Sequence, residues 1–424
     1  MRILIISTFF PPLNSIASLR PYSFAKYWSL AGHEVTVLTL AHDASDSAAL
    51  HCPTSSFSVL EVAHPPFISK LKRAQTSSAG KETKPSFKQK CLHYFRFKKG
   101  ILNACRMPDL ADFWIAPALR ASKTLPTQDL VISTSGPYAT HIIAHKIKKR
   151  GQAKRWVADF RDTWSDSFLY PGLFPFNWIE KKLETFLMRR ADAISIVSEP
   201  LSLSFKERFG QEKVMVIENG FDPEDLGELP QERVFPNDEK LRIVHTGSVY
   251  LGKRDPTDLF LAIANGLKNP KTHALFQKIE VHFVGMRQAN ILDLIEKFSL
   301  QEQIKLTGHV PRKQALAMQR DADLLLFLPW TDPSVDGILT GKLFEYLSSK
   351  TPIISVGASS FEAAQRLIQE AAAGVSFFKE EPLREYLATV LRDKTKIHST
   401  LDWNVVKRYE RKHLAMKLLK KAFG

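Results

Sequence analysis

The chain has 424 residues, of which 44% are hydrophobic, and its formal net charge is +15. Because domains usually span roughly 100–200 residues, this length predicts two domains with ordinary packed cores. No apolar run approaches the roughly 20 residues of a membrane-spanning helix, and the N-terminus enters a strand pattern at residues 2–8, so we expect neither a transmembrane segment nor a signal peptide.

The first half of the chain alternates strand and helix patterns with short connections. After the first strand we expect a helix from about Ser18 to Leu30, with Gly32 after its end, and a strand at Val35–Leu38. Further elements are a strand at Leu130–Ser133, a helix at Ala139–Lys149 and strands at Trp156–Phe160 and Ala193–Val197. This order predicts a parallel sheet with helices on both faces.

A segment rich in Pro, Glu and Asp, without periodicity, interrupts this order at Glu218–Lys240. A second series of strands follows at residues 242–245, 281–284, 324–328, 352–355 and 374–377, and a basic amphipathic helix is expected at 404–422. We therefore predict an α/β protein with an N-terminal domain at 1–218, joined by a C-terminal helix at 404–424, and a second domain at 219–403. Each is a doubly wound, Rossmann-like domain, and ligands should bind beyond the carboxyl ends of the strands, in a cleft between two facing sheets.

The segment Gly337–Glu345 follows a strand and a loop, and it has the pattern of an anion site. Its two glycines, Gly337 and Gly341, flank a helix start, where backbone N–H groups and the helix dipole favour a phosphate. Lys342 would add a positive charge, and Glu345, one turn further, can accept hydrogen bonds from a sugar diol. The alternative is a capped loop with a solvated Glu345.

A second glycine-opened loop begins after the first strand of the second domain, at Gly247 and Ser248. It carries two adjacent cations, Lys253 and Arg254, suited to a pyrophosphate. Asp255 and Pro256 also fit the N-cap and first position of a helix. Both interpretations can hold together.

Polar residues also follow strands of the first domain, at the edge of the sheet where ligands are expected. These are Asn14 and Ser15 with Arg20 on the next helix, Ser135 and Gly136 with His141 on the next helix, and Arg161 with Asp162. Arg161 and Asp162 alternatively form an ion pair that closes the strand end. A helical histidine such as His141 is more often a packed surface residue than a catalytic one.

These segments together resemble the family 4 glycosyltransferases, which have the GT-B fold. Residues 337–347 resemble a branch that reads G-x-x-x-G-K-x-F-E-Y-L. The resemblance implies that Glu345 holds the ribose hydroxyls of the donor, and that the loop amides of Leu339, Thr340 and Gly341 bind its diphosphate. The wider family has a further Glu where this chain has Gly337, and Asp336 is a candidate substitute.

The other motifs match the same family with departures. Lys253 matches a family Lys, whereas Ser248 stands where the family has Arg, and Arg254 is a candidate to compensate. Arg161 stands where the family often has His, before the matching Asp162, and Asn219–Asp222 resembles the family's domain end. The loop after the first strand has Ser15 and Ile16 in place of a glycine pair. The resemblance implies that the first domain binds the acceptor, with Asn14, Ser15, Arg20, Ser135 and Gly136 on the acceptor side.

The resemblance implies a retaining transfer of sugar from a nucleotide-diphosphate sugar to a glycan or lipid-linked acceptor in surface-polysaccharide assembly. Arg161, Asp162 and Lys253 would be catalytic, and no metal or other cofactor is expected, since no Asp-x-Asp pair is placed for a metal–diphosphate bridge. Alternatives are a nucleotide-sugar 2-epimerase of the same fold, a non-catalytic sugar-nucleotide-binding subunit, or a basic membrane- or RNA-binding scaffold.

Charge and cysteine spacing bear on location. Eleven Lys or Arg and one acid lie between Lys70 and Arg106, which favours either a solvated insertion or contact with anionic lipid headgroups. The apolar stretch Phe168–Trp178 is either a buried loop or a lipid contact. No nucleic-acid-binding motif is present, so we expect no nucleic-acid partner. Cys52, Cys91 and Cys105 fit no metal or disulfide spacing, which predicts a protein of the reducing cytoplasm. The basic and apolar segments add peripheral attachment to the inner face of the membrane as an expectation.

Overall fold

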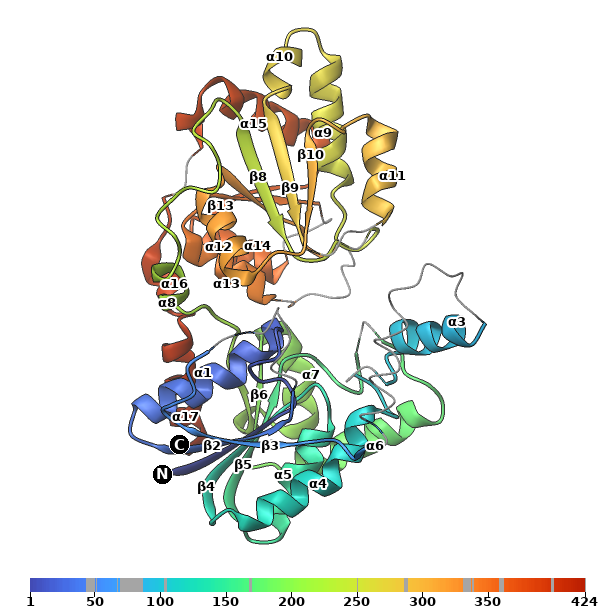
Figure 1. Ribbon diagram of the computed structural model, residues 1–424, viewed down its shortest axis with the longest axis vertical. Helices are drawn as coiled ribbons and strands as arrows, with labels where there is room; N and C mark the ends of the chain where they lie inside the picture. Colours follow the sequence, from blue (N-terminus) through green and yellow to red (C-terminus); the bar gives the residue numbers. More distant parts are fainter. Residues whose placement is uncertain are drawn as a thin grey trace. The chain divides into compact units, whose positions relative to one another are not determined.

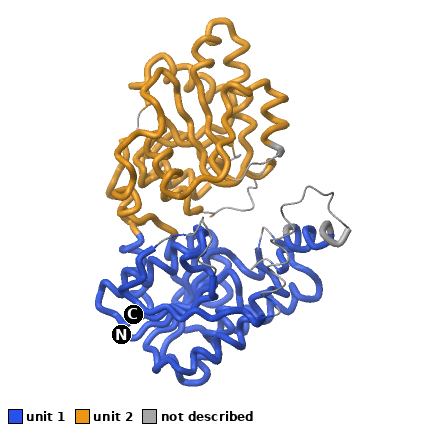
Figure 2. The backbone as a smooth tube through the Cα atoms, in the orientation of Figure 1, with its two compact units in different colours: residues 1–218, 411–424 blue, residues 219–410 orange. Residues whose placement is uncertain are grey.

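The computed structural model describes residues 1–42, 50, 52–66, 68, 87–102, 105–167, 170–249, 251–285, 289–330, 337, 339–357, 362–397 and 400–423. Its backbone contacts divide the chain into two compact units (Figure 2). Unit 1 comprises Met1–Glu218 and Arg411–Gly424, and unit 2 comprises Asn219–Glu410. Each unit is an α/β domain with one parallel sheet.

The sheet of unit 1 has the strand order β3-β2-β1-β4-β5-β6-β7, and every neighbouring pair is parallel. Its strands are β1 (Arg2–Ser7), β2 (Glu34–Leu40), β3 (Ser58–Val62), β4 (Gln128–Thr134), β5 (Ala153–Phe160), β6 (Ala193–Ile196) and β7 (Val214–Val216). Five of these strands were expected from the sequence, whereas the edge strands β3 and β7 were not. β3 is half-exposed and β7 has three residues, so neither shows a continuous apolar run.

Helices cover both faces of this sheet (Figure 1). α1 (Ile16–Leu30) and α17 (Arg411–Phe423) pack on the face that carries Ile3 and Ile5. The opposite face carries Leu4 and Ile6. It is covered by α4 (Ile115–Ala121), α5 (Ala139–Lys149), α6 (Phe176–Arg190) and α7 (Glu199–Phe209). α3 (Phe87–Tyr94) and a π-helix (Phe95–Lys99) belong to the connection between β3 and α4.

The sheet of unit 2 has the order β10-β9-β8-β11-β12-β13 and is also parallel. Its strands are β8 (Leu241–Thr246), β9 (Ile279–Val284), β10 (Ile304–Gly308), β11 (Leu324–Phe327), β12 (Ile353–Val356) and β13 (Gly374–Phe377). One face packs against α9 (Thr257–Lys268), α10 (His273–Phe276), α11 (Ala289–Phe298) and α15 (Glu380–Arg392). The other packs against α12 (Arg312–Asp321), α13 (Gly341–Ser349), α14 (Ala363–Glu370) and α16 (Trp403–Lys407), and α8 (Glu224–Gly227) lies near α12.

The predicted single helix at 404–422 is wrong, because the structure divides it into α16 and α17. Between them, Tyr409 O accepts a hydrogen bond from Phe221 N at 3.1 Å, and Phe221 forms a parallel bridge with Glu410. This pairing holds the backbone extended where the chain passes from one unit to the other. α17 then returns to unit 1, where Trp28 Nε1 donates to Ala415 O at 2.9 Å.

The structure describes only parts of the predicted basic segment and of the apolar stretch. Arg106, the end of the basic segment, is buried, and its guanidinium lies 2.8 Å from the buried Glu180. Residues 69–86 of that segment, Phe168 and Leu169 of the apolar stretch, and Asp336 lie outside the described residues. Within the described part of the chain, no helix has both the length and the apolar character to cross a membrane.

Candidate active site

Gly247 follows β8 and lies at the carboxyl edge of the unit 2 sheet. Its φ is +101°, a region that favours glycine, and its N–H donates to Val284 O at 2.7 Å. A Cβ on residue 247 would lie 2.9 Å from Lys342 Nζ. The structure therefore places together two predicted site residues that are 95 positions apart in the sequence.

Lys342 is held by a buried histidine at the end of β8. His245 Nδ1 lies 2.9 Å from Leu326 O, and its Nε2 lies 3.3 Å from Lys342 Nζ. Because a carbonyl can only accept, Nδ1 carries the proton, and Nε2 accepts from the Lys342 ammonium. Burial, and then the charge of Lys342, hold the pKa of His245 well below its usual value, which keeps the ring neutral.

Lys342 itself lies in a crowded positive environment. Burial, followed by the charge of Arg254, lowers the pKa of Lys342 to about 7, and Glu345 opposes this shift. A bound anion would stabilise the charged form. The local chemistry therefore suits an anionic ligand.

α13 is fixed to β8 by Tyr346. The buried Tyr346 hydroxyl accepts from Thr246 N at 2.8 Å, and Gln319 Nε2 donates to Thr246 Oγ1 at 3.1 Å. Burial raises the pKa of Tyr346 to about 12, so the hydroxyl keeps its proton. This contact sets the first turn of α13 beside Gly247.

The N-terminus of α13 is preceded by a short held loop. Thr340 is the N-cap residue, and its buried Oγ1 has no hydrogen-bond partner among the described residues. Leu339 N donates to Gly337 O at 3.0 Å, and Asn219 Nδ2 donates to Leu339 O at 3.3 Å. Asn219, noted in the sequence as part of a family-like motif, thus supports the loop before the helix.

Gly337 stands where the wider family has a glutamate. Its backbone conformation, and not only its missing side chain, sets this position apart. Its φ is +99°, a conformation that L side chains rarely adopt. The backbone at this position therefore differs from that of an ordinary glutamate.

Lys253 and Arg254 contact the same aromatic ring. Lys253 Nζ and Arg254 Cζ each lie 5.3 Å from the centre of the Trp330 ring. Asp255 accepts from Gly252 N at 2.9 Å and from Thr257 N at 3.0 Å. The helix α9 begins at Thr257 with Pro256 as its N-cap residue, one position later than predicted. Ser248, the residue after Gly247, is half-buried.

Glu345 is not the solvated residue of the alternative interpretation. Its side chain is 12% exposed, and Arg312 Nη2 lies 2.9 Å from both Glu345 Oε1 and Asp225 Oδ2. Burial lowers the pKa of Arg312, but the two carboxylates outweigh it, and the net shift is upward. Arg312 and Asp225 were not expected from the sequence, because no local pattern connects them with Glu345.

In unit 1, Arg161 brings together the ends of three strands. Its Nε donates to Ser135 O at 2.9 Å, its Nη2 donates to Gly136 O at 3.0 Å, and its Cζ lies 4.9 Å from the centre of the Phe9 ring. Phe9, Ser135 and Arg161 follow β1, β4 and β5. Three of the segments predicted for the acceptor side therefore meet at the carboxyl edge of this sheet.

Asp162 lies close enough to Cys105 to affect its ionisation. Burial, then the charges of Asp162 and Asp109, raise the pKa of Cys105 to about 12. The thiol therefore stays protonated at neutral pH and is a poor nucleophile.

The structure does not support the acceptor role predicted for Arg20. Arg20 is buried, with its Nη2 2.7 Å from Asp159 Oδ1, and it also donates to the carbonyls of Ile217 and Glu218. Its hydrogen bonds are used to join α1, β5 and the segment after β7. His141 is likewise fully buried rather than at the surface, with Nδ1 2.7 Å from Ser133 Oγ.

The predicted loop residues Asn14 and Ser15 have different surroundings. Asn14 is exposed, whereas the Ser15 hydroxyl accepts from Ala17 N at 3.2 Å and caps α1. No group of three or more His, Cys, Asp or Glu suited to a metal ion occurs in the part of the chain that the structure describes.

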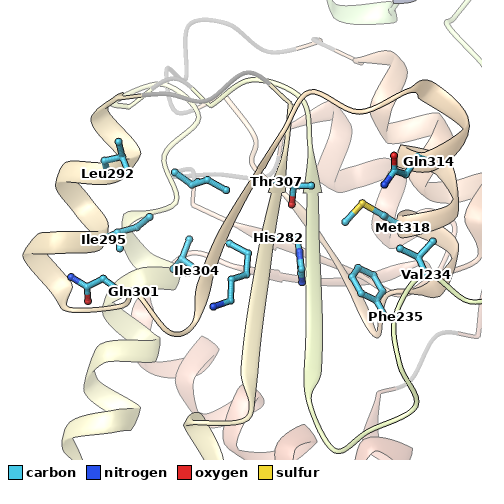
Figure 3. Close-up of a pocket in the computed structure, with 12 residues that line it drawn as sticks. Val234, Phe235, His282, Leu292, Ile295, Gln301, Ile304, Thr307, Gln314 and Met318 are labelled. Atoms are coloured by element: carbon cyan, nitrogen blue, oxygen red, sulfur yellow. The ribbon is translucent and has the colours of Figure 1, made fainter.

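A separate open pocket of about 620 Å³ lies along β10, the edge strand of unit 2. Figure 3 shows its lining side chains, which include Leu292 and Ile295 of α11, His282 of β9 and Met318 of α12. None of the predicted donor-binding residues lines it. This pocket is therefore distinct from the Gly247–Lys342 site.

The chain is similar to known glycosyltransferases in sequence and in structure. Residues 20–225 match the model for Glycosyltransferase Family 4. No curated protein matches the chain in sequence. Sucrose-phosphate synthase from Thermosynechococcus elongatus is similar in structure, with 12% identity and a TM-score of 0.64, over 99% of this chain and 98% of that chain.

Two further solved structures align over essentially the whole chain. A mutant of S. aureus TarM in complex with Fondaparinux, alpha-GlcNAc-glycerol and UDP has 10% identity and a TM-score of 0.64, with 100% of each chain covered. The lipopolysaccharide outer core galactosyltransferase WaaB has 14% identity and a TM-score of 0.54, over 100% of this chain and 99% of that chain. Identities this low show a shared fold, and the fold is GT-B. The match over residues 20–225 and the GT-B fold together support a family 4 glycosyltransferase, and the chain is a glycosyltransferase with the GT-B fold.

Proposed function

We propose that the enzyme moves a sugar, with retention at the anomeric carbon, from a nucleotide-diphosphate sugar to a glycan or lipid-linked acceptor. The observation that carries the proposal is the meeting of Gly247, Lys342 and the N-terminus of α13. At the carboxyl edge of the unit 2 sheet, the backbone of Gly247 carries no side chain, and the buried Lys342 ammonium lies near the positive charge of Arg254. The Thr340 hydroxyl has no hydrogen-bond partner among the described residues. This is the chemistry that a diphosphate requires.

The donor diphosphate would bind at the start of α13. The amides of Leu339, Thr340 and Gly341 and the ammonium of Lys342 would bind its oxygens. Gly247 and Ser248 would form the opposite wall, since a side chain on residue 247 would displace Lys342. Lys253 and Arg254 would add charge from the loop after β8.

Glu345 would hold the ribose of the nucleotide. Arg312 Nη2 contacts Oε1 and so fixes the direction of the carboxylate. Within the described residues, Glu345 Oε2 has no hydrogen-bond partner, so it would accept from the ribose hydroxyls. Asp225 shares Arg312 and acts here as a positioning residue.

The proposed transfer occurs on one face of the sugar. The bond from the anomeric carbon to the diphosphate breaks, the bond to the acceptor oxygen forms on the same face, and the acceptor proton passes to the departing phosphate. Lys253, Arg254 and Lys342 would stabilise the charge that develops on that phosphate. Arg161 and Asp162, beside Ser135 and Gly136, would orient the acceptor, and no metal is required.

The choice of a surface glycan rests on similar proteins. One structural neighbour is a lipopolysaccharide outer core galactosyltransferase, and another is a complex with UDP, Fondaparinux and alpha-GlcNAc-glycerol. The complex supports a uridine nucleotide for this chain, and both neighbours support a glycan acceptor.

A thermal-shift screen with UDP, GDP, ADP and their sugars tests the donor site, because a ligand bound only by the folded state raises stability. We expect UDP or a UDP-sugar to raise the Tm of the natural protein and to have little effect on Glu345→Gln. Lys350→Met, at the far end of α13, is the matched control and should respond like the natural protein. Equal ligand responses in all three proteins would exclude the donor site proposed here.

Turnover separates the remaining candidates. Gly337, in place of the family glutamate, favours a non-catalytic binding subunit as the second candidate. Incubation with labelled UDP-sugars, with and without a lipid-linked glycan, should give labelled acceptor if the proposal holds. Release of a free epimerised sugar would indicate a 2-epimerase, and binding without any turnover would indicate the non-catalytic subunit.

A further inference from the structure

The outer side of α6 in unit 1 carries large aromatic side chains among cations. Phe174, just before the helix, is 80% exposed, and Trp178 is 58% exposed. We call this surface the α6 face, and define it as Phe174, Trp178, Lys181, Lys182, Phe186, Arg189 and Arg190, all of which are exposed. Single exposed apolar residues are ordinary, but an exposed cluster of aromatic residues points to a binding surface.

The α6 face is one side of a helix whose other side is used by the core. Trp178, Lys182 and Phe186 are spaced four residues apart and follow one another along the helix. Residues on the opposite side, Glu180, Glu184, Leu187 and Met188, are buried. The aromatic residues of the α6 face are therefore not required to fill the unit 1 core.

Cations lie directly over the aromatic rings. Lys182 Nζ is 3.6 Å from the centre of the Trp178 ring, and Arg190 Cζ is 3.6 Å from the centre of the Phe186 ring. A hollow of about 310 Å³ opens among Lys181, Lys182, Phe186 and both arginines. Its positive lining suits a phosphate group.

The last turn of α5 extends this positive surface. Lys146 and Lys149 are exposed there, and the ring of the neighbouring His145 lies 5.5 Å from that of Phe186. Lys148 pairs with Asp192, and Lys181 lies 3.7 Å from Asp166.

Among the described residues, the remaining cations of this surface are not offset by carboxylates. In the described part of the chain, Lys146, Lys149, Lys182, Arg189 and Arg190 form no ion pair. The surface formed by α5 and α6 is thus strongly and locally positive.

We propose that the α6 face binds the surface of an anionic lipid bilayer. Phe174, Trp178 and Phe186 would enter the headgroup layer, and the flanking cations would contact lipid phosphates. Aromatic residues next to Lys and Arg are the usual composition of such interfacial helices. Membrane binding would place the enzyme beside a lipid-linked acceptor. This link to the acceptor rests on the proposed function, whereas the membrane binding itself does not.

Other partners fit the α6 face less well. Lysine is depleted from the centres of protein–protein interfaces, whereas here it lies between the aromatic residues. Single-stranded nucleic acid would stack its bases on ring faces, but cations already cover one face of Trp178 and Phe186. Burial in a headgroup layer needs no free ring face.

α17 is also basic, and it differs from α6 in where its apolar residues lie. Its apolar residues, including Leu414, Ala415 and Leu418, are buried in the core beneath α1. The exposed side retains lysines such as Lys420 and Lys421. α17 therefore offers positive charge without the aromatic cluster.

Co-sedimentation with lipid vesicles tests the inference on the full chain. The vesicles are phosphatidylcholine alone or phosphatidylcholine mixed with phosphatidylglycerol. Two variants alter the α6 face, Trp178→Ser with Phe186→Ser and Lys182→Glu with Arg189→Glu. Lys420→Glu with Lys421→Glu on α17 is the control with the same change in net charge.

We expect the natural protein and the α17 control to bind the mixed vesicles and to bind phosphatidylcholine weakly. The charge reversal on α6 should lower the partition coefficient by about a hundredfold or more, and the aromatic double variant by about tenfold. Trp178→Phe should bind like the natural protein but lose part of the fluorescence shift that vesicles induce.

Several outcomes would overturn the inference. These are no binding to mixed vesicles, equal binding by the α6 variants, or an equal loss in the α17 control, which would indicate net charge alone. Binding to RNA or to an acidic protein without vesicle binding would also exclude it. Because these substitutions lie outside the donor site, all variants should keep the Tm increase with UDP, so failure here is distinguishable from failure of the proposed function.

Discussion

The Lys342 ammonium lies above Gly247, where it would be 2.9 Å from a Cβ on residue 247. One residue lies at the end of β8 and the other in the first turn of α13. The position of Lys342 therefore depends on the absence of a side chain from the facing loop.

Gly247→Ala should weaken nucleotide binding more than it weakens the fold. The new Cβ would displace Lys342, and the positive φ would cost about 1–3 kcal/mol of stability. Gly308→Ala is the control, because its φ is also positive and its Cβ would meet nothing within 4 Å. Thermal unfolding should show a lower Tm for both, and titration calorimetry should show weaker UDP binding only for Gly247→Ala.

UDP binding should depend on the protonation of Lys342. Burial and Arg254 lower the pKa of this lysine to about 7 in the free enzyme, and a bound diphosphate would raise it. Below pH 7 the lysine is already charged and adds no pH dependence. Above pH 7 binding must take up a proton, so Kd should rise by up to tenfold per pH unit until the higher pKa of the complex is reached.

Calorimetry in buffers of different ionisation enthalpy would measure this proton uptake directly. Lys342→Met should bind UDP more weakly, by about tenfold or more, since a charge-assisted hydrogen bond contributes roughly 1.5–3 kcal/mol. It should also lose the proton uptake. The same uptake in the natural protein and in Lys342→Met would contradict the assignment.

Arg312 should act on the nucleotide through Glu345. Arg312→Met removes the contact that fixes the carboxylate, and we expect UDP to bind about tenfold more weakly. Glu345→Gln should also weaken binding, and the double variant should lose less than the sum of both effects. Strictly additive losses in a double-mutant cycle would show that the two residues act independently.

Arg20 should be a residue of stability rather than of substrate binding. Arg20→Met leaves the buried Asp159 without its guanidinium partner, which should cost about 3–5 kcal/mol in the free energy of unfolding. Lys26→Met, on the same helix, should change it little. Denaturant unfolding measures the effect, and a normal free energy of unfolding with a raised acceptor KM would restore the acceptor role.

Gly337→Glu should not recreate the contact that the wider family makes. A glutamate at a φ of +99° is strained, so we expect a lower Tm and no gain in turnover or donor affinity. Steady-state rates with the donor identified in the screen would test this. A substantial increase in kcat would show that the loop can rearrange to accept the side chain.

The sequence alone determined the two parallel α/β domains and the local donor-site pattern. Buried parallel strands are continuous apolar runs, and glycines before a helix are a local signal, so β8, β11 and the start of α13 were visible in the sequence. The edge strand β10 was not, because it is half-exposed and lacks that run.

Tertiary structure alone decided which residues share the site and what each one contacts. It joined Lys342 to His245 and Gly247, gave Glu345 a partner in Arg312, and buried Arg20 against Asp159. These pairs are separated by 33 to 139 positions. Periodicity and spacing report only neighbours along one element, whereas such contacts form only when elements distant in the sequence pack against one another.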